Sequence, residues 1–344
     1  AYAVRPEGRA NPQQLCANPS TEADLEVLRR EILAGARETE LGEDGPLLGL
    51  QLTHSGRFAR PEGEHRPRIA FRHPVLDARV GVTSDDAVLG DSELDDLIGE
   101  YARVAVAAER AGFGFVDVKA CHGYLGHELL SARTRPGPYG GDFDGRSRFL
   151  LRAIEAVRAA APSLAIGVRL SVFDFHAFTP GEGGEGIPER VEGHRPFGAA
   201  EGGLGLDLDE THMLLDRLSE AGVTLLCTTA GSPYYNPHIQ RPAFYPPSDG
   251  YRPPEDPLVG VVRQIDATAA LHARHQGLRF VGSAYTYLQE WLPFVTQALV
   301  REGRVDSIGL GRMTLSYPTL PRDVMAGRDL DRPSAVSYTH LRAH

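Results

Sequence analysis

Short apolar runs alternate with amphipathic stretches along most of the chain. In the amphipathic stretches apolar residues recur every three or four positions, as at Leu94, Leu97 and Tyr101, which is the spacing of one helix face. Each apolar run between them has the length and composition of a buried strand. Regular alternation of the two patterns favours β-α units around a parallel sheet. The predicted strands are residues 47–52, 115–118, 165–170, 224–227, 280–282 and 307–310.

Polar residues follow many different predicted strands, and none of the strands is followed by a GxGxxG motif. This distribution favours an α/β fold of the TIM (β/α)8 barrel type, in which loops after several strands share one site, over an open doubly wound sheet. Because six strands are found, we expect a barrel over residues 1–335 that lacks two opening strands. The polar residues are Gln51, Lys119, Arg169, Thr228, Ser283 and Arg312, and insertions 61–90 and 173–207 are expected to cover the same face.

The two ends of the sequence do not fit this pattern. The chain begins at Ala1, without an initiator methionine and inside a loop-like stretch, so the amino-terminal strands are expected to be missing. Residues 336–344 read VSYTHLRAH, which resembles the translation of a sequencing-adaptor read-through. We interpret this segment as a non-native tail and leave it out of the fold prediction.

The charge and cysteine content argue against some classes of partner and indicate the cellular compartment. The chain has 36 Lys and Arg against 46 Asp and Glu, a net charge of −10, and no basic run that would bind a nucleic acid. No apolar run is long enough for a membrane span, and the 3 cysteines are dispersed, which predicts a reducing, cytoplasmic compartment. We therefore expect a small-molecule substrate, and leave open whether the chain forms a homo-oligomer.

The richest cluster of reactive side chains lies in VDVKACHGYLGHELLS, residues 116–131. Lys119, His122, Tyr124 and His127 follow a predicted strand within nine residues, and Gly123 permits a tight turn between them. At the carboxyl end of a barrel strand, Lys119, His122 and Tyr124 can converge on one bound molecule. The alternative is a polar loop whose histidines cap the following helix.

Five motifs, in this order and spacing, resemble the old yellow enzyme family of NADH:flavin oxidoreductases. The resemblance is strongest to the branch of 2,4-dienoyl-CoA reductase and trimethylamine dehydrogenase. It implies a barrel that binds FMN, takes hydride from NADH or NADPH, and reduces the activated C=C bond of an α,β-unsaturated carbonyl compound. The motifs are LGLQLTHSGRFARP (48–61), VDVKACHGYLGHELLS (116–131), YGGDFDGRSRF (139–149), IGVRLS (166–171) and GLGRM (309–313).

The resemblance also implies cofactor-binding residues. Gln51 resembles the amide that contacts the pyrimidine edge of the flavin, where one side chain must both donate and accept hydrogen bonds. Arg169 resembles the arginine beside flavin N1 and O2, where a fixed positive charge stabilises the anion formed on reduction. The residues that match the phosphate end are Gly282, Ser283, Gly311 and Arg312.

Three further residues are implied to act on the substrate. His122 matches the residue that donates a hydrogen bond to the substrate carbonyl, and Tyr124 the acid that protonates its α-carbon. The family places His or Tyr where this chain has Lys119, so we expect carboxylated or more polar substrates. Tyr234 and Tyr235 follow a later strand and are predicted to contact the substrate.

Four other functions stay open on the sequence. Within the same family the chain could be an oxidative demethylase or amine dehydrogenase. A lone lysine at a strand end, Lys119, is also what a class I aldolase needs for its Schiff base. A metallohydrolase could use His54, His122 and His127, and a barrel that only binds a ligand is the fourth alternative.

Overall fold

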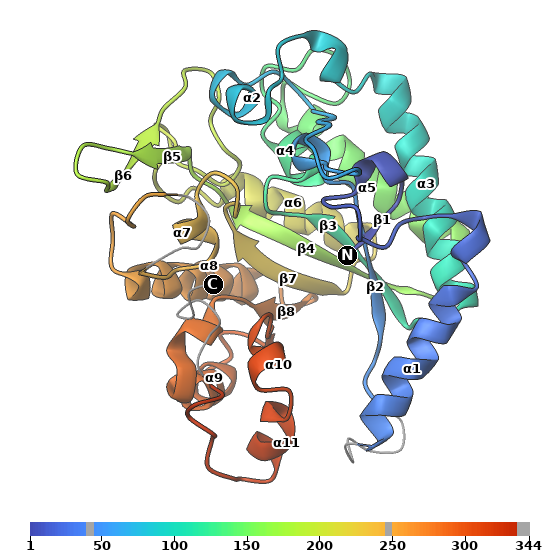
Figure 1. Cartoon of the computed structure of the whole chain (residues 1–344), viewed down its shortest axis with the longest axis vertical. Coiled ribbons are helices and arrows are strands. Elements are labelled where there is room, and N and C mark those ends of the chain that lie inside the picture. Colours follow the sequence, from blue (N-terminus) through green and yellow to red (C-terminus); the bar gives the residue numbers. More distant parts are fainter. Residues whose placement is uncertain (39–44, 245–249, 336–344) are drawn as a thin grey trace. The chain divides into compact units, whose positions relative to one another are not determined.

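A computed structural model describes residues 1–38, 45–244 and 250–335 (Figure 1). The tail expected at residues 336–344 lies outside the described residues. The chain divides into two compact units, and each is described by itself. Unit 1 comprises Ala1–Arg169, Val191–Arg195 and Met213–Leu225, and unit 2 holds the remaining described residues.

Unit 1 contains a parallel sheet of β1 (Tyr2–Ala3), β2 (Gly49–Thr53), β3 (Phe115–Ala120) and the start of β4 (Ala165–Phe173), in that order. β2 and β3 align so that Gln51 lies opposite Asp117. The same register places Gly49 opposite Phe115, and a Cβ at Gly49 would lie 2.2 Å from the phenyl ring. Because only glycine fits there, this pair helps to fix the register.

Helices with one apolar face cover the strands of unit 1. The predicted apolar stripe of α3 (Asp91–Arg110) is fully buried, because Leu94, Leu97 and Tyr101 are no more than 1% exposed. Tyr101 also meets Phe149 edge to face, with ring centroids 6.0 Å apart, which joins α3 to α5 (Phe143–Ala160). The helices are α1 (Asp24–Glu38), α2 (Pro74–Val80), α3 (Asp91–Arg110), α4 (Leu125–Leu130) and α5 (Phe143–Ala160), with 3₁₀ turns η1 (Pro6–Gly8), η2 (Pro19–Thr21), η3 (Gly56–Phe58) and η4 (Asp85–Ala87).

Unit 2 contains the later strands, β7 (Leu225–Ala230), β8 (Arg279–Gly282) and β9 (Ser307–Ile308), in that order, with β8 and β9 parallel. An antiparallel hairpin of β5 (Ala177–Pro180) and β6 (Gly186–Glu189) lies inside the second predicted insertion. The helices of this part are α6 (Asp209–Glu220), which crosses the boundary between units, α7 (Pro237–Gln240), α8 (Pro257–Arg274), η5 (Tyr285–Trp291), α9 (Leu292–Arg301), α10 (Met313–Ser316) and α11 (Leu320–Met325).

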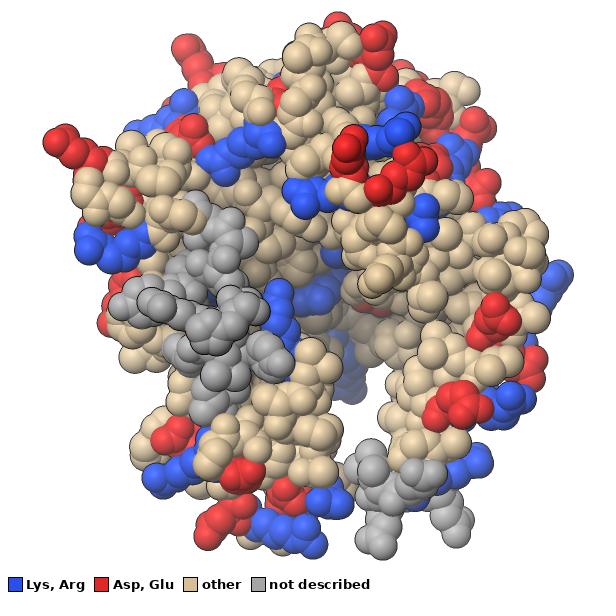
Figure 2. Space-filling model, viewed as in Figure 1, with Lys and Arg blue, Asp and Glu red and all other residues tan. Residues whose placement is uncertain are grey.

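All six predicted strands are confirmed within a few residues, whereas β1 and the β5–β6 hairpin were not predicted. The described strands do not close into a barrel. Within the described part of the chain, no helix is both long and apolar enough to cross a bilayer. On the face shown in Figure 2, acidic and basic side chains of the described residues are interspersed.

Candidate functional site

The turn after β3 brings the reactive residues of the central motif together. His122 and Gly123 both have left-handed backbone angles, with φ of 64° and 75°. Tyr124 then caps α4, and the Gly123 N–H donates to Nδ1 of His127 at 2.8 Å. A left-handed conformation is unfavourable for a residue with a Cβ, so His122 is held there by its surroundings. Strain of this kind is concentrated at functional sites.

Lys119 and Tyr124 are in direct contact across this turn. The ammonium of Lys119 lies 3.5 Å from the centroid of the Tyr124 ring, and both side chains are buried. A buried cation on the face of a phenol ring is a favourable arrangement. Burial is the main reason why the pKa of Lys119 is lowered to about 8; Cys121 and Asp117 act against this shift, and Arg169 acts in the same direction as burial. The amine can therefore change charge near neutral pH.

Gln51, Asp117 and Lys119 form a polar group on the sheet of unit 1. Alternation along β3 places Asp117 and Lys119 on the same face, and Nε2 of Gln51 donates to Oδ2 of Asp117 at 2.5 Å. Arg169 of β4 is close enough to act electrostatically on both Asp117 and Lys119. The structure thus brings together three of the predicted residues, Gln51, Lys119 and Arg169.

The sequence analysis missed Asp117. Burial raises the pKa of its carboxyl group, against the hydrogen bond from Gln51 and the positive charges of Arg169 and Lys119. The available signal was the alternation in VDVK, which places an acid two residues before the lysine in an otherwise apolar strand. We assign Asp117 the role of orienting the Gln51 amide.

A buried ionic cluster anchors α4, the helix that begins after Tyr124. Arg57 of η3 donates through Nε to Oε1 of Glu128 on α4 at 2.8 Å, and it also pairs with Asp77 of α2. The second carboxylate oxygen of Glu128 accepts the N–H of Ala70 at 3.2 Å. Arg57 is 1% exposed, so the cluster is desolvated, and removing one partner would leave an uncompensated charge.

Two other histidines of the motifs have structural partners. Nδ1 of His54 accepts the N–H of Gly56 at 3.1 Å, as Nδ1 of His127 accepts that of Gly123. Burial lowers the pKa of each imidazole to about 3, so both are neutral. Among the described residues, no three His, Cys, Asp or Glu side chains are grouped so as to hold a metal ion.

The predicted phosphate residues lie on neighbouring strands in unit 2. Gly282 ends β8 opposite Ile308 of β9, and the Gly309 N–H donates to the Gly282 carbonyl at 2.8 Å. A Cβ at Gly282 would come within 2.8 Å of the Tyr285 ring, so packing alone requires glycine there. Gly311 and Arg312 follow β9 at the surface, and a Cβ at Gly311 would meet nothing within 4 Å.

The two tyrosines predicted to contact substrate have different surroundings. The buried Tyr235 donates its hydroxyl hydrogen to Oδ2 of Asp174 at 2.5 Å, and Asn236 donates to Oδ1 of the same carboxylate at 2.7 Å. Burial raises the pKa of Asp174 to about 6 against these hydrogen bonds. Tyr235 thus holds the loop to the end of β4. The neighbouring Tyr234 is half-buried, and its contact with substrate stays a prediction.

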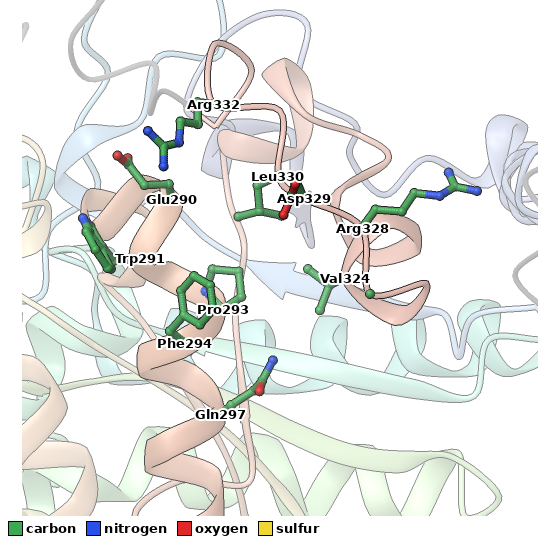
Figure 3. A pocket seen from close by; sticks show the side chains of 11 residues that line it. Glu290, Trp291, Pro293, Phe294, Gln297, Val324, Arg328, Asp329, Leu330 and Arg332 are labelled. Carbon is green, nitrogen blue, oxygen red and sulfur yellow. The ribbon is translucent and has the colours of Figure 1, made fainter.

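A cavity of about 500 Å³ in unit 2 contains none of the predicted site residues (Figure 3). Trp291 and Phe294 of the η5–α9 segment line one side, and Leu330 and Val324 lie across from them. Trp291 is 64% exposed and Phe294 66%, and their rings are 6.3 Å apart. This cavity is unrelated to the chemistry predicted from the motifs.

Comparisons with known proteins agree with the motifs. Residues 3–183 match the model of the NADH:flavin oxidoreductase / NADH oxidase family. The chain is 32% identical to an NADPH dehydrogenase of Bacillus subtilis, over 98% of this chain and 81% of that protein. It is also 32% identical to an NADPH dehydrogenase of Bacillus velezensis, over 51% of this chain and only 48% of the relative.

A solved structure supports the fold. The old yellow enzyme homologue of Zymomonas mobilis superimposes with a TM-score of 0.62 over 98% of this chain and 81% of that one, at 19% identity. This similarity confirms the predicted fold class, an α/β TIM barrel, although the described strands themselves form an open sheet.

Proposed function

Because the chain belongs to the NADH:flavin oxidoreductase / NADH oxidase family, we propose that it reduces the activated C=C bond of an α,β-unsaturated carbonyl compound with hydride from NADH or NADPH. Family membership confirms the expected enzyme class, an oxidoreductase, and the expected cofactors, FMN and NAD(P)H. The reaction and its substrate are the proposal, and the contact between Lys119 and Tyr124 is the observation that carries it.

The polar face of unit 1 fits an FMN ring. Gln51 supplies an amide, which can both donate and accept, and Asp117 holds that amide by a 2.5 Å hydrogen bond. Arg169 and Lys119 add positive charge on the same face. A flavin gains negative charge at its pyrimidine side on reduction, and these cations would stabilise it. When bound, FMN would supply the hydride.

The turn after β3 supplies the groups that act on the substrate. The His122 imidazole would donate a hydrogen bond to the carbonyl oxygen and withdraw electron density from the C=C bond. The β-carbon then accepts hydride, and Tyr124 protonates the α-carbon from its hydroxyl, so that two hydrogens are added across the double bond. The Lys119 ammonium on the Tyr124 ring would stabilise the phenolate until solvent reprotonates it.

Lys119 also suggests a substrate class. A protonated amine beside His122 and Tyr124 favours enones that carry a carboxylate or other polar group. We propose that such substrates are preferred over neutral enones. Replacing Lys119 by Met should then reduce turnover of acidic enones more than that of neutral ones. Unchanged turnover of both would reject this preference.

In unit 2 we propose that Gly282, Ser283, Gly311 and Arg312 hold the FMN phosphate. The adjacent ends of β8 and β9 support this role, since Gly282 and Gly309 are joined by a backbone hydrogen bond. Gly311 is exposed and has no Cβ that would keep an anion away from its backbone N–H, and Arg312 adds a charged fork. Tyr234 and Tyr235 are the proposed substrate contacts, Tyr235 through its ring alone because its hydroxyl is held by Asp174.

The test is an absorbance titration of the full chain supplied with FMN. We expect a flavin spectrum that bleaches with NADH or NADPH and recovers on adding 2-cyclohexenone. Tyr124→Phe should bleach like the parent and recover at least tenfold more slowly, because only the protonation step is impaired. A protein that stays colourless, or one that forms a borohydride-trapped ketone adduct on Lys119, would contradict the proposal and favour the aldolase.

A further inference from the structure

A second cavity, of about 480 Å³, lies within unit 1 and contains none of the residues proposed above. Its wall is built by residues 70–88 of the first predicted insertion, by the loop after α4, and by His194. The segment Val191–Arg195 belongs to unit 1 although the chain on either side of it belongs to unit 2. Half of the lining residues are apolar, and the other half are polar or charged, namely Arg72, Asp85, Thr134, Arg135 and His194. The apolar ones include Ala70, Phe71, Val88 and Pro136.

One wall of this cavity is aromatic. The His194 ring is stacked on Phe71, with centroids 5.8 Å apart and 20° between planes, and it meets His73 at 4.7 Å. Phe71 is buried, so these rings form a fixed surface. Burial, and then the charge of Arg57, lower the pKa of His194, which keeps its imidazole neutral at pH 7. A flat aromatic ring would stack on this neutral imidazole.

The buried Arg135 provides a directional donor. Its two terminal nitrogens donate to the Ala70 carbonyl at 2.6 Å and to Asp91 Oδ1 at 2.7 Å. Its Nε is buried and has no hydrogen-bond partner among the described residues, and the same is true of His194 Nδ1. Arg135 is 6% exposed, and a buried N–H without an acceptor costs about 1–3 kcal/mol. Because Nε is itself enclosed by protein atoms, a ligand oxygen would reach it only after the guanidinium shifts toward the cavity, and accepting from Nε would then remove this cost.

The charges around the cavity favour an uncharged ligand. The Arg135 guanidinium is already paired with Asp91, and Arg72 at the cavity is paired with Asp77 and Asp85. Asp85 itself lines the cavity and is largely exposed. A carboxylate ligand would therefore meet arginines that are already paired, and the exposed Asp85 carboxylate that pairs with Arg72, whereas a carbonyl oxygen needs only an N–H.

We propose that this cavity binds a small, uncharged, planar aromatic carbonyl compound, with its ring against His194 and Phe71 and its oxygen accepting from Arg135. The site is separate from the flavin face, because the two share no residue. It therefore does not depend on the proposed reaction.

The probe is 4′-fluoroacetophenone, titrated into the FMN-supplied chain without NAD(P)H and followed by ¹⁹F NMR. We expect saturable broadening, and at least tenfold weaker binding of 4-fluorobenzoate, the charged counterpart. Thr134 is exposed and lines the cavity, so Thr134→Trp should fill it and weaken binding at least tenfold. Thr83 is equally exposed and does not line the cavity, so Thr83→Trp is the matched control and should bind like the parent.

Two further variants separate this site from the catalytic one. His194→Ala should weaken binding through loss of the stacking surface, while His122→Ala, which lacks the proposed carbonyl donor of the flavin face, should leave it unchanged. If His122→Ala abolishes binding and Thr134→Trp does not, the probe occupies the flavin face and the inference is wrong. Absence of saturable binding at millimolar probe, or tighter binding of 4-fluorobenzoate, would also overturn it.

Discussion

The ammonium of Lys119 lies on the ring face of Tyr124, 3.5 Å from its centroid, although the two residues belong to a strand and to the start of the next helix. The left-handed angles at His122 and Gly123 reverse the chain tightly enough for this contact. The proposed proton donor is therefore touched by a group whose own charge changes near neutral pH.

Turnover should fall as pH rises above about 8. Burial lowers the pKa of Lys119 to about 8, so the ammonium that stabilises the Tyr124 phenolate is present below this pH and lost above it. We expect a decline of about tenfold per pH unit on the alkaline side, measured as kcat with 2-cyclohexenone. In Lys119→Arg the charge persists and the decline should move above pH 10. An identical alkaline limb in both proteins would show that Lys119 is not the titrating group.

Lys119→Met should stabilise the fold at pH 7. Between pH 8 and pH 10.5, Lys119 is protonated in the unfolded chain but largely neutral in the native one. Below pH 8 the native chain must keep the buried charge, which lowers the free energy of unfolding by about 3 kcal/mol. Loss of the contact with Tyr124 offsets about 1–2 kcal/mol of this. We expect a net gain of about 1–2 kcal/mol in urea unfolding that shrinks from pH 8 to 10.5. A destabilised variant would mean that the cation is a net contributor to stability.

Arg57→Met should destabilise the chain by about 3–5 kcal/mol, because it leaves Asp77 and Glu128 as buried carboxylates without their shared cation. Turnover should also drop, since Glu128 anchors the helix that Tyr124 caps. Urea unfolding gives the first quantity. Arg66 pairs with Glu62 at the surface, and Arg66→Met should change stability by less than about 0.5 kcal/mol. Similar losses in the two variants would argue against a special role for the buried cluster.

Replacing His122 by glycine and by alanine should separate chemistry from backbone strain. Both variants lose the proposed donor to the carbonyl, and we expect kcat to fall by about 10²-fold in each. Glycine adopts φ of 64° without a Cβ penalty, so His122→Gly should be about 1 kcal/mol more stable than His122→Ala. Thermal unfolding of the pair provides the measurement. Equal stability would indicate that the turn relaxes when the imidazole is removed.

The sequence predicted the strands well because each is an apolar run whose period and boundaries are local properties. It also predicted that Lys119, His122 and Tyr124 share one place, since they lie within six residues. Burial of Arg57 could not be predicted, because its partners Asp77 and Glu128 are up to 71 positions away. The contact of Asp117 with Gln51 could not be predicted either, because it depends on the β2–β3 register. The β5–β6 hairpin in the second insertion was missed because it depends on long-range packing.

The tight turn at His122 and Gly123 also sets limits on how this enzyme can be modified. Only four residues lie between Lys119 of β3 and Tyr124, and two of them, His122 and Gly123, have left-handed backbone angles. If Lys119 sets the substrate preference as proposed, single substitutions at position 119 would redesign selectivity while keeping the length of this segment. Inserting or deleting one residue between Lys119 and Tyr124 would rotate the Tyr124 ring away from Lys119. Directed evolution of this site should therefore substitute residues and keep the length of the turn constant.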